Sequence, residues 1–282
     1  MDKQPRDLRA ATAAPVALLL VLLAVGSTLF SRLASAPSPQ REIAGYATNL
    51  KGRTASQRHN ARLAALALDG RVIAPGAVFS FNQAVKSWSV DEGYVKAPVS
   101  FDGELVRAYG GGVCQTSTTL YNAALLAGLP ILERHPHVFR PQYIPPGRDA
   151  AVAYPGVDLR FRNSYAWPMR VRASAEGGKL QVRLLGGERP SASIHIATEI
   201  VSSTTPVRLT RIARRAGSPL RESTPSDDAR RRAYLRSAGE AGYRVVTYRV
   251  FSQSGRAVRR ERLSDDTYPA MNRVIALTET PQ

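Results

Sequence analysis

Three consecutive glycines lead directly into the single cysteine of the chain. Residues 110–112 permit a sharp backbone turn, and the periodic apolar residues after Cys114 predict a helix that Gly128 and Pro130 end. Unpaired N–H groups and the dipole at the start of a helix favour negative charge, and therefore a reactive thiolate. We predict that Cys114 is a working thiol. The alternative is a small side chain packed where a helix approaches a sheet.

Alternating apolar residues predict strands on both sides of this helix. Before it, the pattern predicts a strand over 42–50 and a helix over 56–68. After it, the pattern predicts a half-buried antiparallel meander over 158–184. Two further strands are expected at 243–251 and 257–263. The predicted fold class is α+β, in which the helix that carries the cysteine packs on an antiparallel sheet.

A long apolar stretch, residues 10–30, follows a short basic N-terminus. As a helix it would be roughly 30 Å long, which matches the hydrocarbon core of a bilayer. We expect one transmembrane signal anchor, with residues 1–9 in the cytoplasm, residues 31–40 as a linker and the bulk of the chain extracytoplasmic. Small residues ending at Ala36 offer the alternative of cleavage and secretion, although Pro37 disfavours that step.

The net charge of +17 over 282 residues indicates an acidic partner. Outside the cytoplasm, the candidates are anionic wall polymers and phospholipid headgroups. A nucleic acid is not expected, because the predicted membrane segment argues against it and no nucleic-acid motif is present. A lone cysteine cannot form an intrachain disulfide, which adds weight to a working role for Cys114.

Five arginines alternate with apolar residues along the predicted meander and are therefore expected on its outer face. They are Arg160, Arg162, Arg170, Arg172 and Arg183. This face predicts either a docking surface for an anionic polymer or an ordinary solvated surface, and runs of charge are more often the latter.

Motifs in order along the chain resemble those of the VanW family. They lie at residues 75–82, 93–94, 97–98, 103–105, 110–124, 133–137, 143–150 and 158–163. The resemblance covers about residues 41–200. It implies an exported or membrane-anchored bacterial protein linked to the cell wall, in a family named for an accessory protein of vancomycin resistance clusters, and it implies no settled activity. A small β-element is predicted over residues 239–280, of which about residues 242–268 resemble a G5-like element weakly. Residues 201–238 predict a linker with a short helix.

Histidines and carboxylates follow the cysteine in an order that suits a cysteine enzyme, which needs a base for the thiol and a group that orients the base. We predict Cys114 as the nucleophile, His137 as the base and Asp149 as the orienting carboxylate. His135 and Asp158 are the second choices. The order is similar in layout to transglutaminase-like and papain-like folds.

Backbone N–H groups near the cysteine are candidates for an oxyanion hole, and Gln115 or Ser117 would assist them. The spacing of the cysteine and histidines predicts no metal site, and no cofactor is expected.

Two functions follow from the sequence. The first is a cysteine-dependent acyl-transfer enzyme, a hydrolase or an acyltransferase, that acts on peptidoglycan peptides or wall proteins. The second is a non-catalytic protein that binds the cell wall or serves as a scaffold through its basic sheet face. A cell-wall polymer or peptidoglycan peptide is the expected partner, together with the inner membrane through the N-terminal helix.

Overall fold

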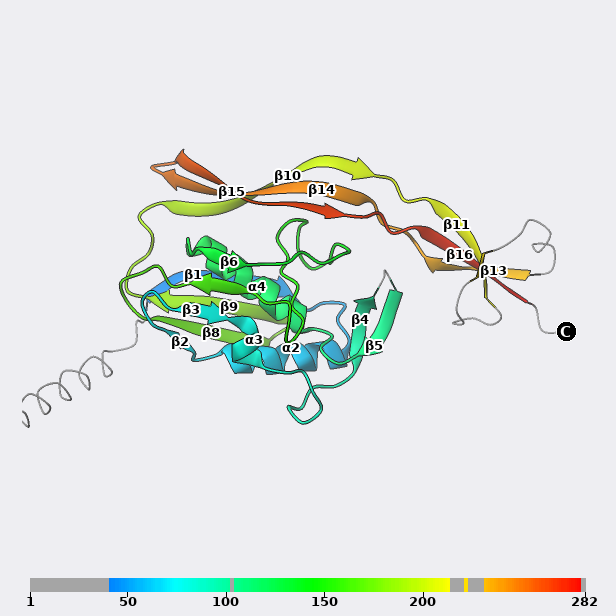
Figure 1. The fold of residues 1–282 in the computed structure, drawn as a ribbon, viewed down its shortest axis with the longest axis horizontal. Helices are drawn as coiled ribbons and strands as arrows, with labels where there is room; N and C mark the ends of the chain where they lie inside the picture. The colour runs from blue at the N-terminus through cyan, green and yellow to red at the C-terminus, as the bar shows by residue number, and fades with distance from the viewer. Residues whose placement is uncertain (1–40, 102–103, 214–220, 223–230, 280–282) are drawn as a thin grey trace, which may run out of the picture. The chain divides into compact units, whose positions relative to one another are not determined.

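Antiparallel strands dominate the computed structural model of this chain, which describes residues 41–101, 104–213, 221–222 and 231–279 (Figure 1). Strands account for 45% and helices for 16%. The predicted α+β class, a cysteine-bearing helix on one sheet behind a transmembrane helix, is therefore wrong. Much of the additional strand lies after residue 193, beyond the strands that the sequence predicts at 243–251 and 257–263.

The predicted membrane segment, residues 10–30, lies outside the described residues, as do the predicted cytoplasmic tail and the linker over 31–40. Within the described ranges, no helix has the length and the apolar character needed to cross a bilayer.

A hairpin of two alternating strands, β8 (Met169–Glu176) and β9 (Lys179–Gly186), forms the centre of the main sheet. Both glycines of its turn, residues 177–178, have positive φ angles, which explains why the turn needs glycine. β1 (Arg41–Asn49) pairs with β9 and β2 (Val72–Ile73) pairs with β8, both antiparallel. The inward side chains of the hairpin are the buried Met169, Val171, Ala173, Leu180, Val182 and Leu184.

Two helices of 14 residues contact this sheet, α2 (Ala55–Leu68) and α4 (Val113–Leu126). Thr54 begins α2 with a complete capping box, in which its side chain accepts the N–H of Gln57 and the Gln57 side chain accepts the N–H of Thr54. Nearly every side chain of α4 is buried, so this helix runs through the core (Figure 1). The resulting layer of α2, α4 and the main sheet holds the cysteine at a fixed place.

Glycine is required where α4 begins, because α4 starts against α2. Gly112 caps α4 with a φ of 107°. A Cβ atom at this position would collide with the carbonyl oxygen of Gln57, and one at Gly111 would lie 2.7 Å from the carbonyl oxygen of Pro98. The glycine run therefore permits a close backbone approach as well as a sharp turn.

A second small sheet shows where the predicted meander was wrong. β7 (Arg160–Arg162) pairs with β3 (Val78–Ser80) and β6 (Ile131–Glu133), and not with β8. The rings of Phe79 and Phe161 stack across this sheet at 5.0 Å. The segments that complete this part of the fold are the short helix α3 (Phe81–Val85) and the hairpin of β4 (Ala97–Phe101) and β5 (Glu104–Ala108).

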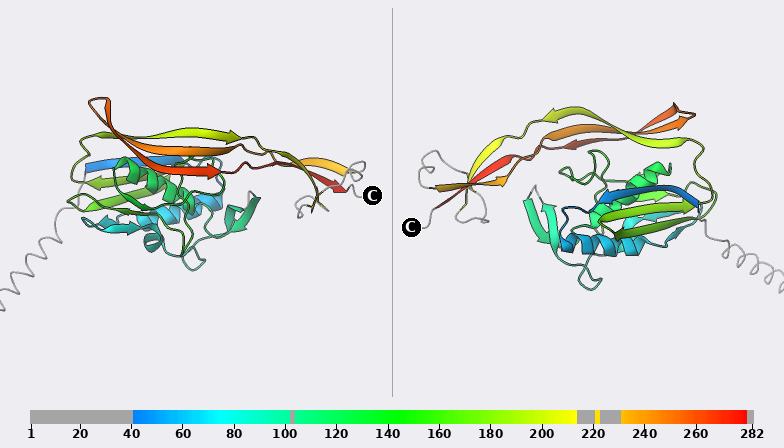
Figure 2. Two further views of the ribbon diagram at one scale, coloured as in Figure 1. Left: turned by 45° about the horizontal axis from the view of Figure 1, so that its top comes forward. Right: turned by 180° about the vertical axis from the view of Figure 1, so that it is seen from behind.

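The C-terminal part contains two further sheets (Figures 1 and 2). The first consists of β10 (Ser193–Thr204), β14 (Gly242–Gln253) and β15 (Arg256–Tyr268), all antiparallel. The second consists of β11 (Arg208–Ala213), β12 (Arg221–Glu222), β13 (Arg231–Ser237) and β16 (Arg273–Glu279), in which β11 and β16 run parallel. Most of the described residues of 201–238 therefore lie in strands, whereas the sequence predicts a linker with a short helix.

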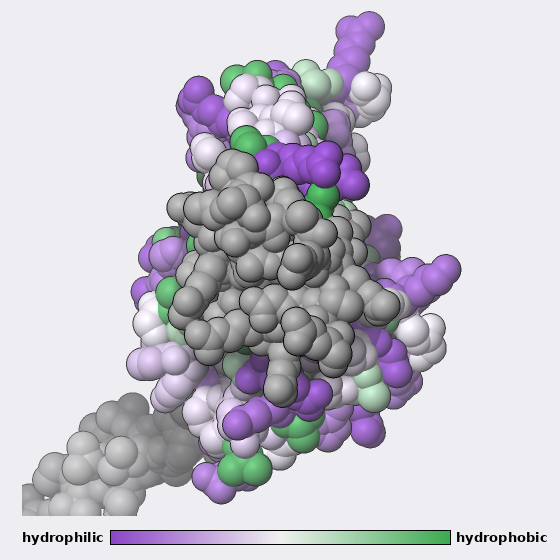
Figure 3. Space-filling view, turned by 90° about the vertical axis from the view of Figure 1, so that its right-hand side faces the viewer, coloured by the Kyte–Doolittle hydropathy of each residue, from purple (hydrophilic) through white to green (hydrophobic). Residues whose placement is uncertain are grey.

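The sheet of β10, β14 and β15 packs against the cysteine-bearing layer. Arg249 on β14 donates to the carbonyl oxygens of Leu129, at 2.8 Å, and Leu125, at 3.5 Å, beside the C-terminal end of α4. Both oxygens of Glu261 on β15 bind the same guanidinium group. The described atoms on the face in Figure 3 are mostly hydrophilic with scattered hydrophobic residues, consistent with a strongly charged chain.

Candidate active site

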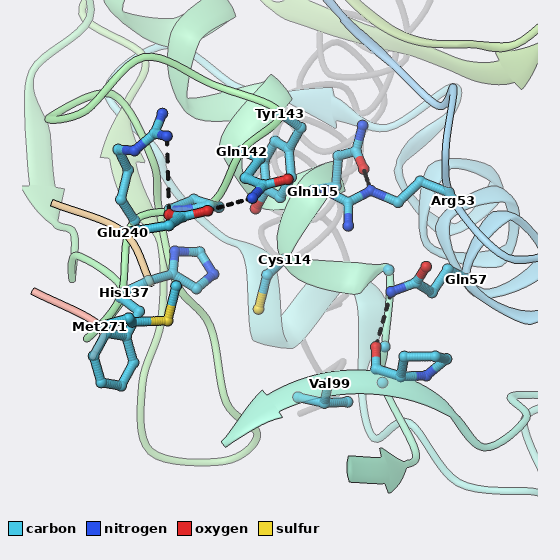
Figure 4. A pocket seen from close by; sticks show the side chains of 17 residues that line it. Arg53, Gln57, Val99, Cys114, Gln115, His137, Gln142, Tyr143, Glu240 and Met271 are labelled. Carbon is cyan, nitrogen blue, oxygen red and sulfur yellow. Dashed lines mark hydrogen bonds and ion pairs between the residues drawn. The ribbon is translucent and has the colours of Figure 1, made fainter. Parts of the chain in front are cut away.

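Cys114 is the second residue of α4 and lines a cavity of about 390 Å³ (Figure 4). Its Sγ lies 3.4 Å from the carbonyl oxygen of Val152, and the residue is partly exposed. The cysteine N–H belongs to the first turn of the helix, where N–H groups have no acceptor within the helix. This position offers a nucleophile and a donor for an oxyanion at the same wall of the cavity.

His137 lines the same cavity and is fixed by the buried Asp149. The Oδ2 atom of Asp149 lies 2.7 Å from both the ring Nδ1 and the backbone nitrogen of His137. Because Nδ1 faces the carboxylate, Nε2 is the ring nitrogen left to serve the thiol. Figure 4 shows the ring of His137 beside the side chain of Cys114.

The arrangement of Cys114, His137 and Asp149 favours the charged forms of the thiol and the imidazole. Burial alone would raise the pKa of the Cys114 thiol, but the hydrogen bond and the charge of His137 outweigh it and hold that pKa below its ordinary value. Burial also opposes the charged imidazole, yet hydrogen bonds to Asp149 and Cys114 raise the pKa of His137 to about 10. Against the cost of burial, the bond to His137 lowers the pKa of Asp149 to about 2. The arrangement therefore supports a thiolate beside an imidazolium at neutral pH.

Further side chains hold the second oxygen of Asp149. Its Oδ1 accepts from the Tyr268 hydroxyl at 2.5 Å and from Arg134 at 3.1 Å. Arg134 also binds both oxygens of Asp266 at 2.7 Å. None of these three was predicted from the sequence, because Arg134 is a buried charge inside a motif and the other two lie on a distant strand. Their one detectable signal is the spacing of Asp266 and Tyr268, which places both on one face of a strand.

Arg53 and Tyr143 complete the cavity wall next to the cysteine (Figure 4). The Arg53 Nε donates to the Gln115 Oε1 at 3.0 Å, and its guanidinium carbon lies 4.8 Å from the centre of the Tyr143 ring. Burial raises the pKa of Tyr143, and the nearby negative charge of Cys114 adds to that rise. The cavity thus places a cation and a neutral phenol beside the sulfur.

Of the two side chains predicted to assist an oxyanion hole, Gln115 lines the cavity and Ser117 does not. Gln115 lines the cavity, but its amide group donates to the side chain of Thr48 and the carbonyl of Asn49. The Ser117 hydroxyl donates to the carbonyl of Ala150 at 2.6 Å and is buried. Ser117 therefore ties α4 to the segment that carries Asp149.

The second-choice residues do not line the cavity. His135 lies on the surface with its Nε2 at 3.1 Å from the Glu133 Oε1. Asp158 accepts from the Ser80 hydroxyl at 2.5 Å and from the backbone N–H of Asn82. Asp158 thus organises the start of α3, where it accepts the N–H of the second residue of that helix.

The five arginines of the expected basic face are divided between two sheets. Arg160 and Arg162 lie on β7, whereas Arg170, Arg172 and Arg183 lie on β8 and β9. Three of them have acidic partners, with distances of 3.6 Å from Arg160 to Glu133, 2.9 Å from Arg172 to Asp69 and 4.0 Å from Arg183 to Glu42. These five arginines therefore do not form one continuous basic face on a meander.

The described residues include no group of three or more His, Cys, Asp or Glu side chains arranged to hold a metal ion.

Comparison with known proteins places the cysteine-bearing layer in a family. Residues 56–185 match the model described as VanW like protein. The chain is 40% identical over 148 residues to the uncharacterized protein YoaR of Bacillus subtilis, which covers 52% of this chain and 49% of YoaR. It is 30% identical over 144 residues to the vancomycin B-type resistance protein VanW of Enterococcus faecalis, which covers 49% of this chain and 52% of that protein. The chain thus spans about half the length of each relative.

Two solved structures with G5 in their titles also match the chain. The crystal structure of HP0197-G5 matches with a TM-score of 0.14 and 19% identity, covering 30% of this chain and 96% of its own. The IgA1 protease G5 domain structure matches with a TM-score of 0.19 and 17% identity, covering 34% and 100%. These scores support no inference about the C-terminal strands. The family match, in contrast, spans every VanW-like motif found in the sequence, since those motifs lie within residues 75–163. Residues 56–185 of this chain belong to the VanW family.

Proposed function

We propose that the chain is a cysteine-dependent acyl-transfer enzyme of the bacterial cell envelope that acts on peptidoglycan peptides or wall proteins. The observation that carries the proposal is that Cys114 and His137 line one cavity beside each other, with His137 held by the buried Asp149 (Figure 4). A nucleophile, a base and a group that orients the base are the parts that thiol acyl transfer needs.

The chemistry proceeds in two balanced steps. The Cys114 thiolate attacks the carbonyl carbon of the substrate, the C–S bond forms, and the carbonyl electron pair moves to oxygen. As the carbonyl re-forms, the bond to the leaving amine breaks and the His137 imidazolium gives that amine its proton. Water or a second amine then attacks the thioester, His137 takes the proton of the attacking group, and the thiolate leaves. Water gives hydrolysis, and an amine gives peptide transfer.

The cavity favours an acyl donor with a negatively charged group. Arg53 lines the same cavity as Cys114, and a guanidinium pairs with a carboxylate through two parallel hydrogen bonds. Wall stem peptides carry free carboxylates, and the relative from Enterococcus faecalis is named for vancomycin resistance. We therefore place the substrate in the cell wall and the working domain outside the cytoplasm.

The alternative is a non-catalytic wall-binding protein that uses the five arginines. This alternative has the weaker support, because those arginines are divided between two sheets and three of them have acidic partners.

Alkylation of Cys114 by iodoacetamide, followed across pH on the full chain, tests the proposal. We expect rapid alkylation well below the ordinary cysteine pKa of about 8.5, and we expect His137→Ala to move the midpoint up to that value. Peptidoglycan fragments incubated with the chain should lose or exchange an acyl group, and Cys114→Ser should abolish that turnover. Alkylation at alkaline pH only, with no change in His137→Ala, would contradict the proposal.

A further inference from the structure

Two side chains of β15 reach the carboxylate behind the histidine. The Tyr268 hydroxyl donates to the Asp149 Oδ1 at 2.5 Å and accepts from the N–H of Gly147 at 3.0 Å. Asp266 binds Arg134 through both of its oxygens at 2.7 Å, and Arg134 donates to the Asp149 Oδ1 at 3.1 Å. Tyr268, Asp266, Arg134 and Asp149 are all buried, with side-chain or residue exposures of 6% or less.

The spacing on β15 explains why these two residues reach inward. Asp266 and Tyr268 are two apart and share the buried face of the strand, while Asp265 and Thr267 are exposed. β15 begins more than 70 residues after the end of the family match at residue 185. On the basis of the proposed function, we propose that the β14–β15 hairpin is part of the active site, and that Asp266 and Tyr268 are positioning residues for Asp149.

The charges alternate in sign from the hairpin to the sulfur. Asp266 is negative, Arg134 positive, Asp149 negative, His137 positive and Cys114 negative when the thiol is ionised. Arg134 alone would draw the charge of Asp149 away from the imidazolium. Asp266 offsets the guanidinium and so leaves Asp149 able to stabilise the imidazolium, which in turn stabilises the thiolate.

Tyr268 orients the carboxylate group of Asp149 through its hydroxyl. The N–H of Gly147 orients the hydroxyl oxygen, so the hydroxyl proton points at the Asp149 Oδ1. Burial and the charge of Asp149 raise the pKa of Tyr268 above its ordinary value, and the phenol therefore remains a donor throughout the working pH range. With Oδ1 held in this way, Oδ2 faces both nitrogens of His137.

Other groups also face this cluster and belong to its pH response. Tyr121 of α4 lies beneath the Arg134 guanidinium, with 5.6 Å between the guanidinium carbon and the ring centre. Its own pKa is raised to about 12 by burial, so it stays neutral. Arg53 and Tyr143 face Cys114 from the cavity side. None of these groups is altered in the test below.

The segments that flank the hairpin also form the cavity wall. Glu240, just before β14, and Met271, just after β15, both line the cavity and exchange two backbone hydrogen bonds of 2.9 Å. Gln142 of the cavity rim donates to the Glu240 carboxylate (Figure 4). The C-terminal segment therefore meets the site both behind Asp149 and at its entrance.

The first test measures how the charge of Asp266 affects the ionisation of Cys114, through the pH midpoint of Cys114 alkylation by iodoacetamide. Asp266→Asn should raise the midpoint by about half a pKa unit, which makes alkylation about threefold slower at pH values below the midpoint. The matched control is Asp265→Asn, which removes the same charge from the neighbouring exposed position and should leave the rate unchanged. The double variant Arg134→Gln with Asp266→Asn removes both charges and should restore the midpoint, which a purely structural role of Asp266 would not predict.

The second test reads orientation through the Nδ1–H proton resonance of His137. A fixed bond to Asp149 keeps this signal downfield and slow to exchange, so Tyr268→Phe should broaden or remove it. Tyr248→Phe on β14, whose hydroxyl lies outside the site, should retain it.

The outcomes separate the two proposals. An ordinary thiol midpoint in the parent chain, unchanged in His137→Ala, overturns the proposed function. A low midpoint that His137→Ala raises, together with an unchanged midpoint in Asp266→Asn and an intact resonance in Tyr268→Phe, overturns only the role of the hairpin. If Asp266→Asn does not fold, the double variant still decides the point, because a midpoint shifted away from the parent value in that variant also contradicts the charge argument.

Discussion

One carboxylate oxygen of Asp149 holds His137 at two points, since Oδ2 lies 2.7 Å from both the ring Nδ1 and the backbone nitrogen. The ring orientation and the path of the chain are therefore set by the same atom. The imidazole of a surface loop would otherwise sample several rotamers, and a base is effective only when it points at the proton it takes.

Replacement of Asp149 by Asn should remove the charge but preserve the size of the side chain. The imidazolium loses its strongest partner, so the thiolate at Cys114 becomes rarer at neutral pH. We expect turnover and alkylation at pH 7 to fall by roughly 100-fold or more, within the range attributed to positioned acid–base groups. Asp91→Asn, an exposed carboxylate elsewhere, should leave both rates unchanged. Equal rates in the two variants would exclude a role of Asp149 in ionising the thiol.

Stability should depend on pH in a way that reports the ion pair. The pKa of His137 is raised from 6.5 to about 10, so its contribution is full below 6.5 and is lost as pH rises through about 10. The pKa of Cys114 is lowered from 9.0, so its contribution is full above 9.0 and is lost as pH falls through the lowered value. The two slopes cancel at pH values that lie above both 6.5 and the lowered Cys114 pKa and below 9.0, where folded and unfolded chains bind equal numbers of these protons.

The free energy of unfolding should therefore stay level with pH in that range and fall from 9.0 toward 10. Urea denaturation at closely spaced pH values measures this profile. In Cys114→Ser the cancellation is lost, and stability should decline from pH 6.5 upward instead. A level profile in that variant would show that the histidine has no raised pKa of its own.

Gly112→Ala should destabilise the fold by about 2–4 kcal/mol, because the new Cβ meets a backbone carbonyl of α2 at a φ angle that favours glycine. Gly178→Ala is the matched control, since its φ is also positive but no atom lies within 4 Å of the added Cβ. The control should cost about 1 kcal/mol for the backbone conformation alone. Thermal and urea unfolding of both variants measure the difference, and equal losses would show that the close approach to α2 is unimportant.

Arg249→Gln should cost about 2–3 kcal/mol, because the carbonyl oxygens beside the end of α4 lose a buried charged donor. Arg259 binds the same Glu261 from an exposed position, so Arg259→Gln should change stability by less than about 0.5 kcal/mol. Denaturation midpoints compare the two. A small loss of stability in Arg249→Gln would mean that the contact between β14 and the end of α4 contributes little to the stability of the fold.

Local patterns predicted the parts of the fold whose cause is local. The ends of α4, the helix α2 and the turn of the β8–β9 hairpin follow from caps, glycines and alternation within a few residues. The pairing of β7 with β3 and β6 could not be predicted in this way, since alternation identifies the buried face of a strand but not its neighbour. The strands β11, β12 and β13 within 201–238 were not predicted, because that segment has few apolar residues at alternate positions.

The residues of the candidate site likewise include some that the sequence predicted and others that it could not. Cys114, His137 and Asp149 were named together because the order of residue types suits a thiol enzyme, and the structure brings these three together. Their catalytic roles remain a proposal. Arg134, Asp266 and Tyr268 act on Asp149 across more than 100 residues of chain in two of the three cases, and a separation of that kind leaves no local pattern to detect.

The hydroxyl that fixes Asp149 comes from a residue 119 positions later in the chain. During synthesis, which proceeds from the N-terminus, the residues of the cysteine-bearing layer are available long before those of β15. Until β15 joins the fold, Tyr268 and Asp266 cannot hold Asp149, so we expect the full reactivity of the thiol to appear only with the last strands.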